Sequence, residues 1–279
     1  MKVFPFKIPK PEQNALVFQE DYGVVFYDKL HQHEDLQLSV IVEGEGTLIV
    51  GDTINEYKPG DILIIGSYLP HVFKSDPQAN NHSHMLSLFF TKNTFGKDFF
   101  ELEMFHELKS FFKRSKHGFK ITSQQNTIQT SFSQLKGASK LSQFIISLEV
   151  LKTASKANYK SLSSFIYDKK YTEREGKRLS AVFEYTMSHF DNEITLDQIS
   201  DVANMSKNAF CKYFKRRTNK TYFRFLNELR VEHACKLLCA SKELTIAEVA
   251  STVGFNNLSN FNRQFKAIKS VSPSEYRKQ

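Results

Sequence analysis

The sequence predicts an α+β protein with an N-terminal antiparallel β-barrel, a helical appendage and a C-terminal all-α domain that contains two helix-turn-helix units. Three observations predict this fold class. The first ninety residues alternate short β-rich runs with turn-forming segments. Apolar residues then recur at helical spacing. In the last hundred residues, one helix-turn-helix pattern occurs twice, about fifty positions apart.

The barrel is predicted over residues 1–95, where turn segments such as GEG, VGD and KPGD separate the β-rich runs. In one run, Leu36, Leu38, Val40 and Val42 alternate with more polar neighbours, which is typical of a half-buried strand. Many short strands with frequent turns favour an antiparallel barrel or sandwich. The expected strands are residues 15–19, 24–27, 36–43, 47–50, 62–65 and 85–91.

A helical extension is predicted at residues 96–155, for packing or for dimerisation. Apolar spacing indicates helices at 97–114 and 125–153, the second with an apolar side formed by Ile145, Leu148 and Leu151. Residues 156–176 are polar, rich in Ser and Lys and weakly periodic, which indicates a linker. The C-terminal domain is then expected over residues 177–279.

The repeat in the C-terminal domain is the most specific pattern in the chain. Its first copy, TLDQISDVANMS, begins at Thr195, and its second, TIAEVASTVGFN, begins at Thr245. In each copy the Thr is followed three positions later by Gln198 or Glu248. A Thr that caps a helix and a Gln or Glu that reaches back to it form a capping box, so two helices are predicted to begin at matched positions.

Each copy continues through a tight turn into a second helix. Asn204 and Gly254 stand at the turns and suit a left-handed backbone. Ser206 is a good N-cap for the second helix of the first copy. The two helix-turn-helix units are therefore expected at about residues 195–218 and 245–269.

The second helices, residues 206–218 and 257–269, are the predicted recognition helices, whose outward side chains would read the major groove of double-stranded promoter DNA. Arg and Lys suit guanine, and Asn suits adenine. A connecting helix at residues 222–240 would span about 28 Å, close to the ~34 Å of one DNA turn. The candidate DNA-binding residues are Lys207, Asn208, Cys211, Lys212, Lys215, Asn257, Leu258, Ser259, Asn260, Arg263 and Lys266.

The distribution of charge along the chain is consistent with a nucleic-acid partner. The net charge is +8, and residues 177–279 hold 17 Lys and Arg against 10 Asp and Glu, whereas the rest of the chain is nearly balanced. Basic surface concentrated in one domain is expected of a phosphate-backbone binder, although an anionic membrane surface would attract it too. No run approaches the ~18 apolar residues of a membrane span, and no signal peptide is evident. No membrane contact and a cytoplasmic location are expected.

The C-terminal domain resembles the AraC/XylS family of bacterial transcription regulators over roughly residues 177–279. The resemblance rests on RVEHACKLLCAS from Arg230, on IAEVASTVGFNNLSNFNRQFK from Ile246 and on SPSEYRK from Ser272. It implies binding to asymmetric sites near promoters and often contact with RNA polymerase. Carried over by position, it assigns base contacts to Asn208, Cys211, Lys212, Leu258, Ser259, Asn260 and Arg263.

The sequence departs from that family pattern in two respects. Asn219 and Ser270 stand where the family usually has Gly. Asn tolerates a left-handed backbone and Ser does so less well, so the second loop is expected to be strained or rearranged. Cys211 replaces a longer polar side chain that is common in relatives, which predicts fewer base contacts from the first recognition helix.

The N-terminal part resembles a cupin barrel. The resemblance rests on His31-x-His33, Gln37, Gly44 and the run KPGDILIIGSYLPH that ends at His71. Metal-binding cupins use two His, a Glu and a later His. On a regular strand His31, His33 and Gln37 would project from the same side, and His71 would approach from a neighbouring strand. Because a neutral Gln replaces the carboxylate, the site would hold a divalent ion weakly, so we expect an effector pocket at these four residues, with no metal and no cofactor.

Three functions follow from the two resemblances. The leading one is a ligand-responsive transcription regulator that is not an enzyme. The alternative from another class is a cupin metalloenzyme with a helical accessory domain. A third is a DNA-binding protein whose barrel only forms a homodimer.

Overall fold

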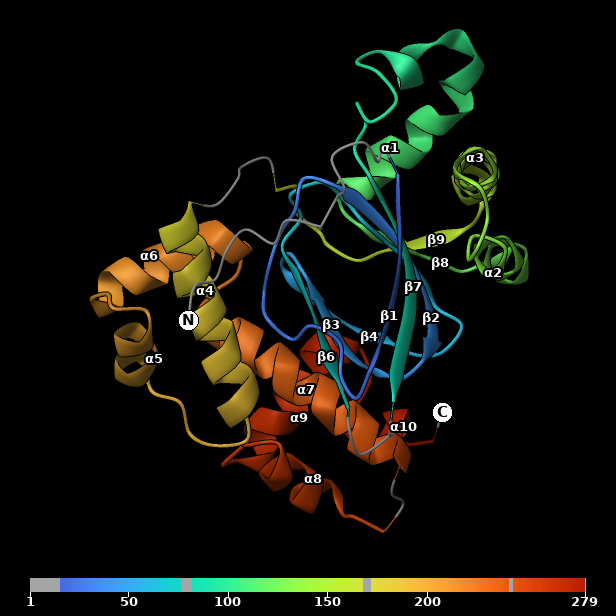
Figure 1. The fold of residues 1–279 in the computed structure, drawn as a ribbon. Coiled ribbons are helices and arrows are strands. Elements are labelled where there is room, and N and C mark those ends of the chain that lie inside the picture. Colours follow the sequence, from blue (N-terminus) through green and yellow to red (C-terminus); the bar gives the residue numbers. More distant parts are fainter. Residues whose placement is uncertain (1–15, 77–81, 168–171, 241–242, 279) are drawn as a thin grey trace. The chain divides into compact units, whose positions relative to one another are not determined.

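The computed structural model describes residues 16–76, 82–167, 172–240 and 243–278 (Figure 1). The chain forms two compact units, Met1–Gly176 and Lys177–Gln279. The first is rich in strands and the second is helical, which confirms the α+β fold class. Within the described ranges, no helix is long and apolar enough to cross a membrane.

The first unit is built on two antiparallel sheets. The six-stranded sheet has the order β1-β7-β2-β5-β8-β9, and the three-stranded sheet has the order β4-β3-β6. Leu38 of β2 is paired with Leu88 on one side and Ile64 on the other, so β2 is a central strand. The strands are β1 (Val17–Gly23), β2 (Leu36–Glu43), β3 (Gly46–Val50), β4 (Thr53–Tyr57), β5 (Ile62–Ile65), β6 (His71–Ser75), β7 (Ser83–Phe90), β8 (Phe119–Ile121) and β9 (Tyr159–Ser161).

Several predicted strands need correction. Residues 24–27 form no strand, because Val24 and Val25 are exposed while Phe26 turns inward and is buried. The first strand begins at Val17 and continues to Gly23, later than predicted; residue 15 lies outside the described residues. Strands β4 and β6, which the sequence pattern did not reveal, complete the three-stranded sheet.

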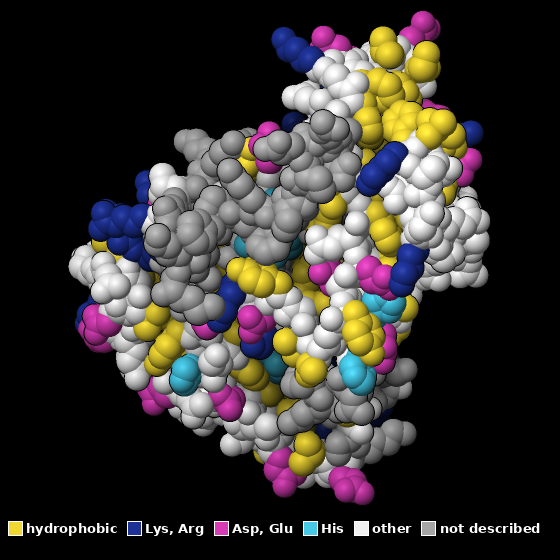
Figure 2. Space-filling view, in the orientation of Figure 1, with side chains coloured by type: hydrophobic (Ala, Val, Ile, Leu, Met, Phe, Trp, Pro, Cys, Tyr) yellow, Lys and Arg dark blue, Asp and Glu magenta, His cyan; other side chains and the backbone are white. Residues whose placement is uncertain are grey.

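The helical extension is more interrupted than predicted. Residues 99–108 form 3-10 turns, and the predicted helix at 125–153 is split where Gly137 adopts a φ of 75°. Ile145 is exposed, so only part of the predicted apolar side faces the core. Figure 2 shows hydrophobic side chains gathered on the surface of the segment that holds η1 and η2. The elements are η1 (Phe99–Glu101), η2 (Glu103–Leu108), α1 (Lys109–Ser115), α2 (Gln125–Ser133) and α3 (Lys140–Lys156).

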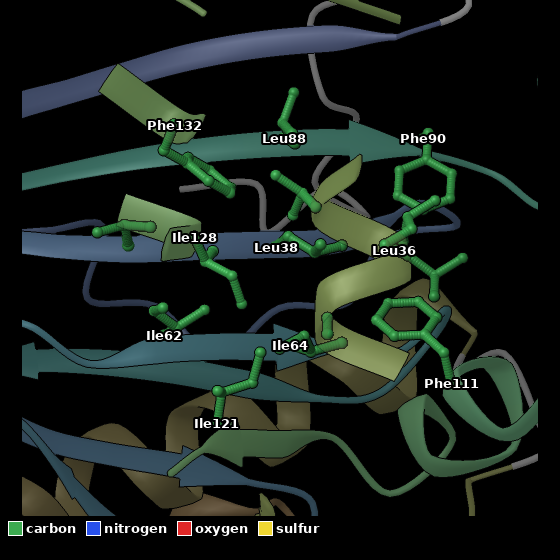
Figure 3. Close-up of a cluster of buried hydrophobic side chains, with 14 of the residues drawn as sticks. Leu36, Leu38, Ile62, Ile64, Leu88, Phe90, Phe111, Ile121, Ile128 and Phe132 are labelled. Atoms are coloured by element: carbon green, nitrogen blue, oxygen red, sulfur yellow. The ribbon is translucent and has the colours of Figure 1, made fainter. Parts of the chain in front are cut away.

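Strand β2 is covered on both faces, which corrects the expectation of a half-buried strand. Leu36 and Leu38 pack in the cluster between the six-stranded sheet and the helices of the extension (Figure 3). Ile41, on the opposite face, belongs to a second cluster inside the barrel. Gln37 and Ser39 share that inner face and are buried. The barrel interior is therefore polar at this end of β2.

The predicted linker is wrong for residues 159–164, which belong to the first unit. Strand β9 pairs with β8 at the edge of the six-stranded sheet. Leu162 is buried in the inner cluster. Ser163 Oγ donates to Asp52 Oδ1 at 2.8 Å, and the N–H of Ser164 donates to the same oxygen at 2.9 Å. The chain is thus fastened to the barrel well beyond the predicted end of the helical extension.

The second unit is organised around one long helix, α7. Near its start, the ring of Phe225 lies 5.8 Å from that of Phe214 in the first helix-turn-helix unit. In the second half of α7, Val231 and Leu238 join a cluster with Phe261 of the second helix-turn-helix unit. One helix therefore joins two small cores, and its bounds are those predicted. The helices are α4 (Glu173–His189), α5 (Leu196–Val202), α6 (Lys207–Thr218), α7 (Tyr222–Ala240), α8 (Ile246–Thr252), α9 (Leu258–Lys269) and α10 (Pro273–Tyr276).

Candidate functional site

The first helices of the two repeats begin with the predicted capping boxes. The N–H of Gln198 donates to Thr195 Oγ1 at 3.2 Å, and the N–H of Thr195 donates to Gln198 Oε1 at 2.8 Å. Thr245 and Glu248 make the same pair of hydrogen bonds at 3.2 and 2.7 Å. The N–H and the hydroxyl of Thr245 both donate to the Glu248 carboxyl and lower its pKa, because they favour its ionised form. Helices α5 and α8 therefore start in the same way.

The two turns also match. The N–H of Met205 donates to the carbonyl of Ser200 at 3.0 Å, and fifty residues later the N–H of Phe255 donates to the carbonyl of Ala250 at 2.9 Å. Asn204 adopts a φ of 50° and Gly254 a φ of 87°, the left-handed conformation that was expected. The repeat in the sequence is therefore a repeat of backbone structure.

The predicted recognition helices, α6 and α9, each bury one side and expose the other. Phe210 and Phe214 of α6 are fully buried, as are Phe261 and Phe265 of α9. The eleven candidate DNA-binding residues lie on the opposite sides or at the helix start, and all are exposed except Asn260, which is half-buried. Each helix packs on α7 and on the first helix of its own unit, which leaves both outward sides accessible.

Three candidate DNA-binding residues on the second helix-turn-helix unit contact one another. Asn257 is the N-cap of α9, and its side chain accepts from the N–H of Asn260 at 3.0 Å. Asn260 Oδ1 in turn accepts from Arg263 Nη2 at 2.9 Å. Asn257 and Asn260 thus shape the start of the helix and orient Arg263, which is exposed.

The basic candidates on the first helix-turn-helix unit differ in their partners. Lys207 Nζ lies 2.6 Å from Asp197 Oδ1, an exposed ion pair that a DNA phosphate would have to displace. Lys212 and Lys215, both exposed, make no ion pair within the described part of the chain. Of the three, Lys212 and Lys215 are the better placed to meet an anion.

A short backbone segment holds the two helix-turn-helix units together. Arg230 of α7 donates from Nε to the carbonyl of Phe190 at 2.7 Å and from Nη2 to the carbonyl of Asn192 at 2.8 Å. A Cβ at Gly254 would lie 2.8 Å from the carbonyl oxygens of Phe190 and Asp191. The turn of the second helix-turn-helix unit therefore packs directly against the segment that leads into the first helix-turn-helix unit.

The two positions where the family pattern usually has Gly are left-handed. Asn219 adopts a φ of 55° and Ser270 a φ of 65°. The N–H of Ser270 donates to the carbonyl of Lys266 at 2.9 Å and ends α9. The second loop keeps the usual conformation and accepts the strain of a serine there.

Three histidines meet inside the barrel of the first unit. The backbones of His31 and His71 form a β-bridge, with N–O distances of 3.1 and 2.9 Å. The ring centroid of His71 lies 4.2 Å from that of His31 and 5.0 Å from that of His33. Gln37 Oε1 lies 3.2 Å from His33 Nε2. The structure thus brings together the four residues proposed for the effector pocket.

Two family models match the chain: a helix-turn-helix domain over residues 199–279 and a cupin domain over residues 25–82. The chain carries a helix-turn-helix domain and a cupin domain.

Relatives of the helix-turn-helix domain include the uncharacterized HTH-type transcriptional regulator YdeC of Bacillus subtilis, 32% identical over 101 residues, and the MmsAB operon regulatory protein of Pseudomonas aeruginosa, 31% identical over 105 residues. The matches cover 36% and 37% of this chain and 34% of each relative, so the chain spans about a third of their length. The solved DNA-binding domain of AdpA, in complex with a target DNA, is 26% identical with a TM-score of 0.35, over 36% of this chain and 90% of that one.

Two histidines of the cupin domain, His31 and His71, are held as neutral rings. Burial and then the neighbouring His33 lower the pKa of His31 to about 3, and burial lowers the pKa of His71 well below its usual value. The Nδ1 atoms of all three histidines lie 2.8 to 2.9 Å from backbone carbonyls. A carbonyl only accepts, so Nδ1 of His31 and of His71 carries the proton and Nε2 of each carries a lone pair. His33 Nε2 instead faces an acceptor, Gln37 Oε1. His71 Nε2 is buried and has no hydrogen-bond partner among the described residues.

This donor set fits a divalent transition metal, because the three imidazoles place ligand atoms within 4.8 Å of one another. Gln37 adds no charge to balance the ion, and its amide is engaged by His33 and by Ser39 Oγ at 2.9 Å. The cavity at the cluster has a volume of about 60 Å³, which is room for an ion or a water and not for an organic effector. The four residues meet as expected, but the pocket they form is smaller than an effector requires.

Sequence reasoning missed one exposed residue of the helix-turn-helix domain. The buried Phe210 of α6 corresponds to Phe261 of α9, an offset of fifty-one. The same offset takes Cys211 to Asn262, which is exposed on α9 beside Arg263. Asn260 corresponds instead to Ala209, which is half-buried. Applying the offset consistently along the helix would have selected Asn262 from the sequence.

Proposed function

We propose that the protein is a sequence-specific DNA-binding transcription regulator that inserts α6 and α9 into adjacent major-groove segments of double-stranded promoter DNA. The observation that carries this proposal is the matched pair of recognition helices on one connecting helix, each with a buried Phe side and an exposed polar and basic side. The nineteen residues of α7 span about 28 Å, close to one DNA turn of ~34 Å. The relatives of this domain that are named as regulators support the same function.

Arg263 is the side chain that we expect to contribute most to base recognition. Replacing it with alanine should cost about 1–3 kcal/mol of discrimination at one base step, because the guanidinium would pair with a guanine edge. Binding assays of the full chain on a genomic operator fragment and on its single-base variants measure this. If Arg263→Ala retains the wild-type preference at every position, Arg263 does not read bases.

Lys215→Ala is the matched control, since the lysine is exposed on α6 at a position that suits a phosphate. It should lower affinity for all sequences alike and reduce the salt dependence of binding by about one charge. A sequence-selective loss in Lys215→Ala would place this lysine among the base contacts instead.

The ligand response is proposed for the first unit, whose cupin barrel is joined in sequence to the DNA-binding unit. A ligand shifts the equilibrium between two conformational states of the protein only if it favours one of them. A second copy of the chain is a proposed partner, supported by the exposed apolar side chains of Leu102 and Met104. RNA polymerase is proposed on the family resemblance alone.

A cupin metalloenzyme is the second candidate, favoured by the buried, unpartnered Nε2 of His71 beside two further imidazoles. Metal analysis of the purified full chain tests it. Stoichiometric iron or manganese that is lost in His31→Ala and kept when the exposed His106 is replaced by alanine would favour the enzyme. Metal-free protein that still binds its DNA site would exclude it.

A further inference from the structure

The first unit contains a second cavity that is far larger than the one at the histidines. Its volume is about 480 Å³ against about 60 Å³. It lies between α1 and the loop that follows β5, at one end of the barrel, and we call it the α1 cleft. A volume of this size falls in the range of pockets that bind small organic molecules.

Backbone contacts fix the walls of the α1 cleft. A Cβ at Gly66 would lie 2.0 Å from the carbonyl oxygen of Ser115, so the end of β5 and the end of α1 are in direct contact. The next loop residue, Ser67, leads to Tyr68, whose N–H donates to the carbonyl of His33 at 2.7 Å. Tyr68 adopts a φ of 57°, a strained conformation for a tyrosine. The cleft is therefore preformed.

The walls of the α1 cleft are positively charged. Among the described residues, four lysines line it, and Glu101 is the only acidic residue that does so. Lys92 is bonded to Glu101 and holds the pKa of that carboxyl below its usual value, so these two charges offset each other. Lys109, Lys113 and Lys116 remain, and within the described residues no ion pair engages Lys113 or Lys116.

The helix alone does not account for these charges. Lysines at the end of α1, such as Lys113 and Lys116, favour the negative end of the helix dipole. Lys109 is the first residue of α1, but η2 runs directly into this helix, so Lys109 does not stand at a free helix N-terminus. An anion in the cleft would lie among all three lysines.

The rest of the lining is apolar or aromatic and includes Leu36, Phe100, Phe112 and Tyr167. The rings of Phe100 and Phe112 contact each other at an interplanar angle of 58° with centroids 4.9 Å apart, so they present aromatic surface next to the lysines. A bare inorganic anion would leave most of this volume and surface unused. The lining matches a molecule with an acidic group and an apolar body.

We propose that the α1 cleft binds an organic anion with an aromatic or aliphatic body. Ile166 and Tyr167 belong to its lining, and α4 of the DNA-binding unit begins only six residues after Tyr167. A ligand in the cleft therefore contacts the segment that leads into the DNA-binding unit. The regulatory role of the ligand rests on the proposed function, whereas the binding of an organic anion in the α1 cleft does not.

The test uses two fluorescent probes with the same aromatic body, 8-anilinonaphthalene-1-sulfonate, which is an anion, and N-phenyl-1-naphthylamine, which is neutral. The full chain should bind the anionic probe saturably with one site. The double variant Lys113→Ala/Lys116→Ala should weaken that binding about tenfold, since each partly exposed charge contact contributes a factor of about three. Binding of the neutral probe should change little.

The matched control is Lys140→Ala/Lys152→Ala, which removes the same charge from exposed positions on α3 outside the cleft. It should leave binding of both probes unchanged. Equal weakening of the anionic probe by both double variants, or no weakening by either, overturns the proposal. An operator-binding assay separates the proposal for the α1 cleft from the proposed function. Wild-type chain that binds the anionic probe but no DNA would contradict the proposed function and would not contradict ligand binding in the cleft.

Discussion

Replacing Gly254 with alanine should destabilise the second unit by about 3 kcal/mol and lower its melting temperature by roughly 15 °C. The residue has a φ of 87°, which costs an L-amino acid about 1–2 kcal/mol. The added Cβ would also lie 2.8 Å from the carbonyl oxygens of Phe190 and Asp191. Thermal unfolding of the full chain, followed by circular dichroism, measures the loss.

Gly137→Ala is the matched control for backbone strain. Gly137 also has a positive φ, of 75°, but a Cβ there would meet no heavy atom within 4 Å. It should therefore cost only about 1 kcal/mol. If the two variants lose the same free energy, the contact between Gly254 and the 190–191 backbone does not constrain the fold.

The same substitution should weaken DNA binding beyond its effect on stability. The Phe190–Asn192 backbone is held by Arg230 of α7 and rests against the turn between α8 and α9. Pushing this segment away would shift one recognition helix relative to the other. At a temperature where Gly254→Ala remains folded, affinity for the full operator should fall, whereas affinity for a half-site read by one helix should change less.

The features that sequence predicted well are those set by neighbouring residues. Each capping box joins residues three apart, and each turn depends on a residue such as Asn204 or Gly254 that tolerates a positive φ. The bounds of α7 followed from the apolar spacing alone. Local signals of this kind are complete within a few residues, so they are visible without knowledge of the fold.

The features that sequence missed depend on distant partners. Strand β9 is a three-residue polar segment, and it is a strand only because β8, some forty residues earlier, offers it an edge. Asp52 anchors Ser163 across 111 positions. The α1 cleft joins lysines of one helix to Tyr68 and Tyr167 from distant loops. Spacing predicted that the histidines would meet, but not that β2 would be buried on both faces and leave them so little room.

Lowering the pH from 7 to 5 should destabilise the first unit, by about 2 kcal/mol from His31 alone, because each pH unit below the unfolded pKa of about 6.5 costs about 1.4 kcal/mol. The pKa of His31 is lowered to about 3 in the folded chain, so between pH 6.5 and 3 the unfolded chain binds the proton and the folded chain does not. The lowered pKa of His71 acts in the same direction. The pKa of Asp21, which also lines this cavity, is raised by burial and acts in the opposite direction.

Urea unfolding at several pH values measures the slope of stability against pH, and the slope rather than the absolute stability is the readout. His31→Gln should flatten it between pH 7 and 5, even if the variant is less stable throughout. His106→Gln, which removes an exposed histidine, should leave it unchanged, and Asp21→Asn should steepen it. An unchanged slope in His31→Gln would mean that this imidazole is not held neutral by the fold. Below about pH 6.5 its Nε2 would then be protonated and would lack the lone pair that any ion at the three histidines requires.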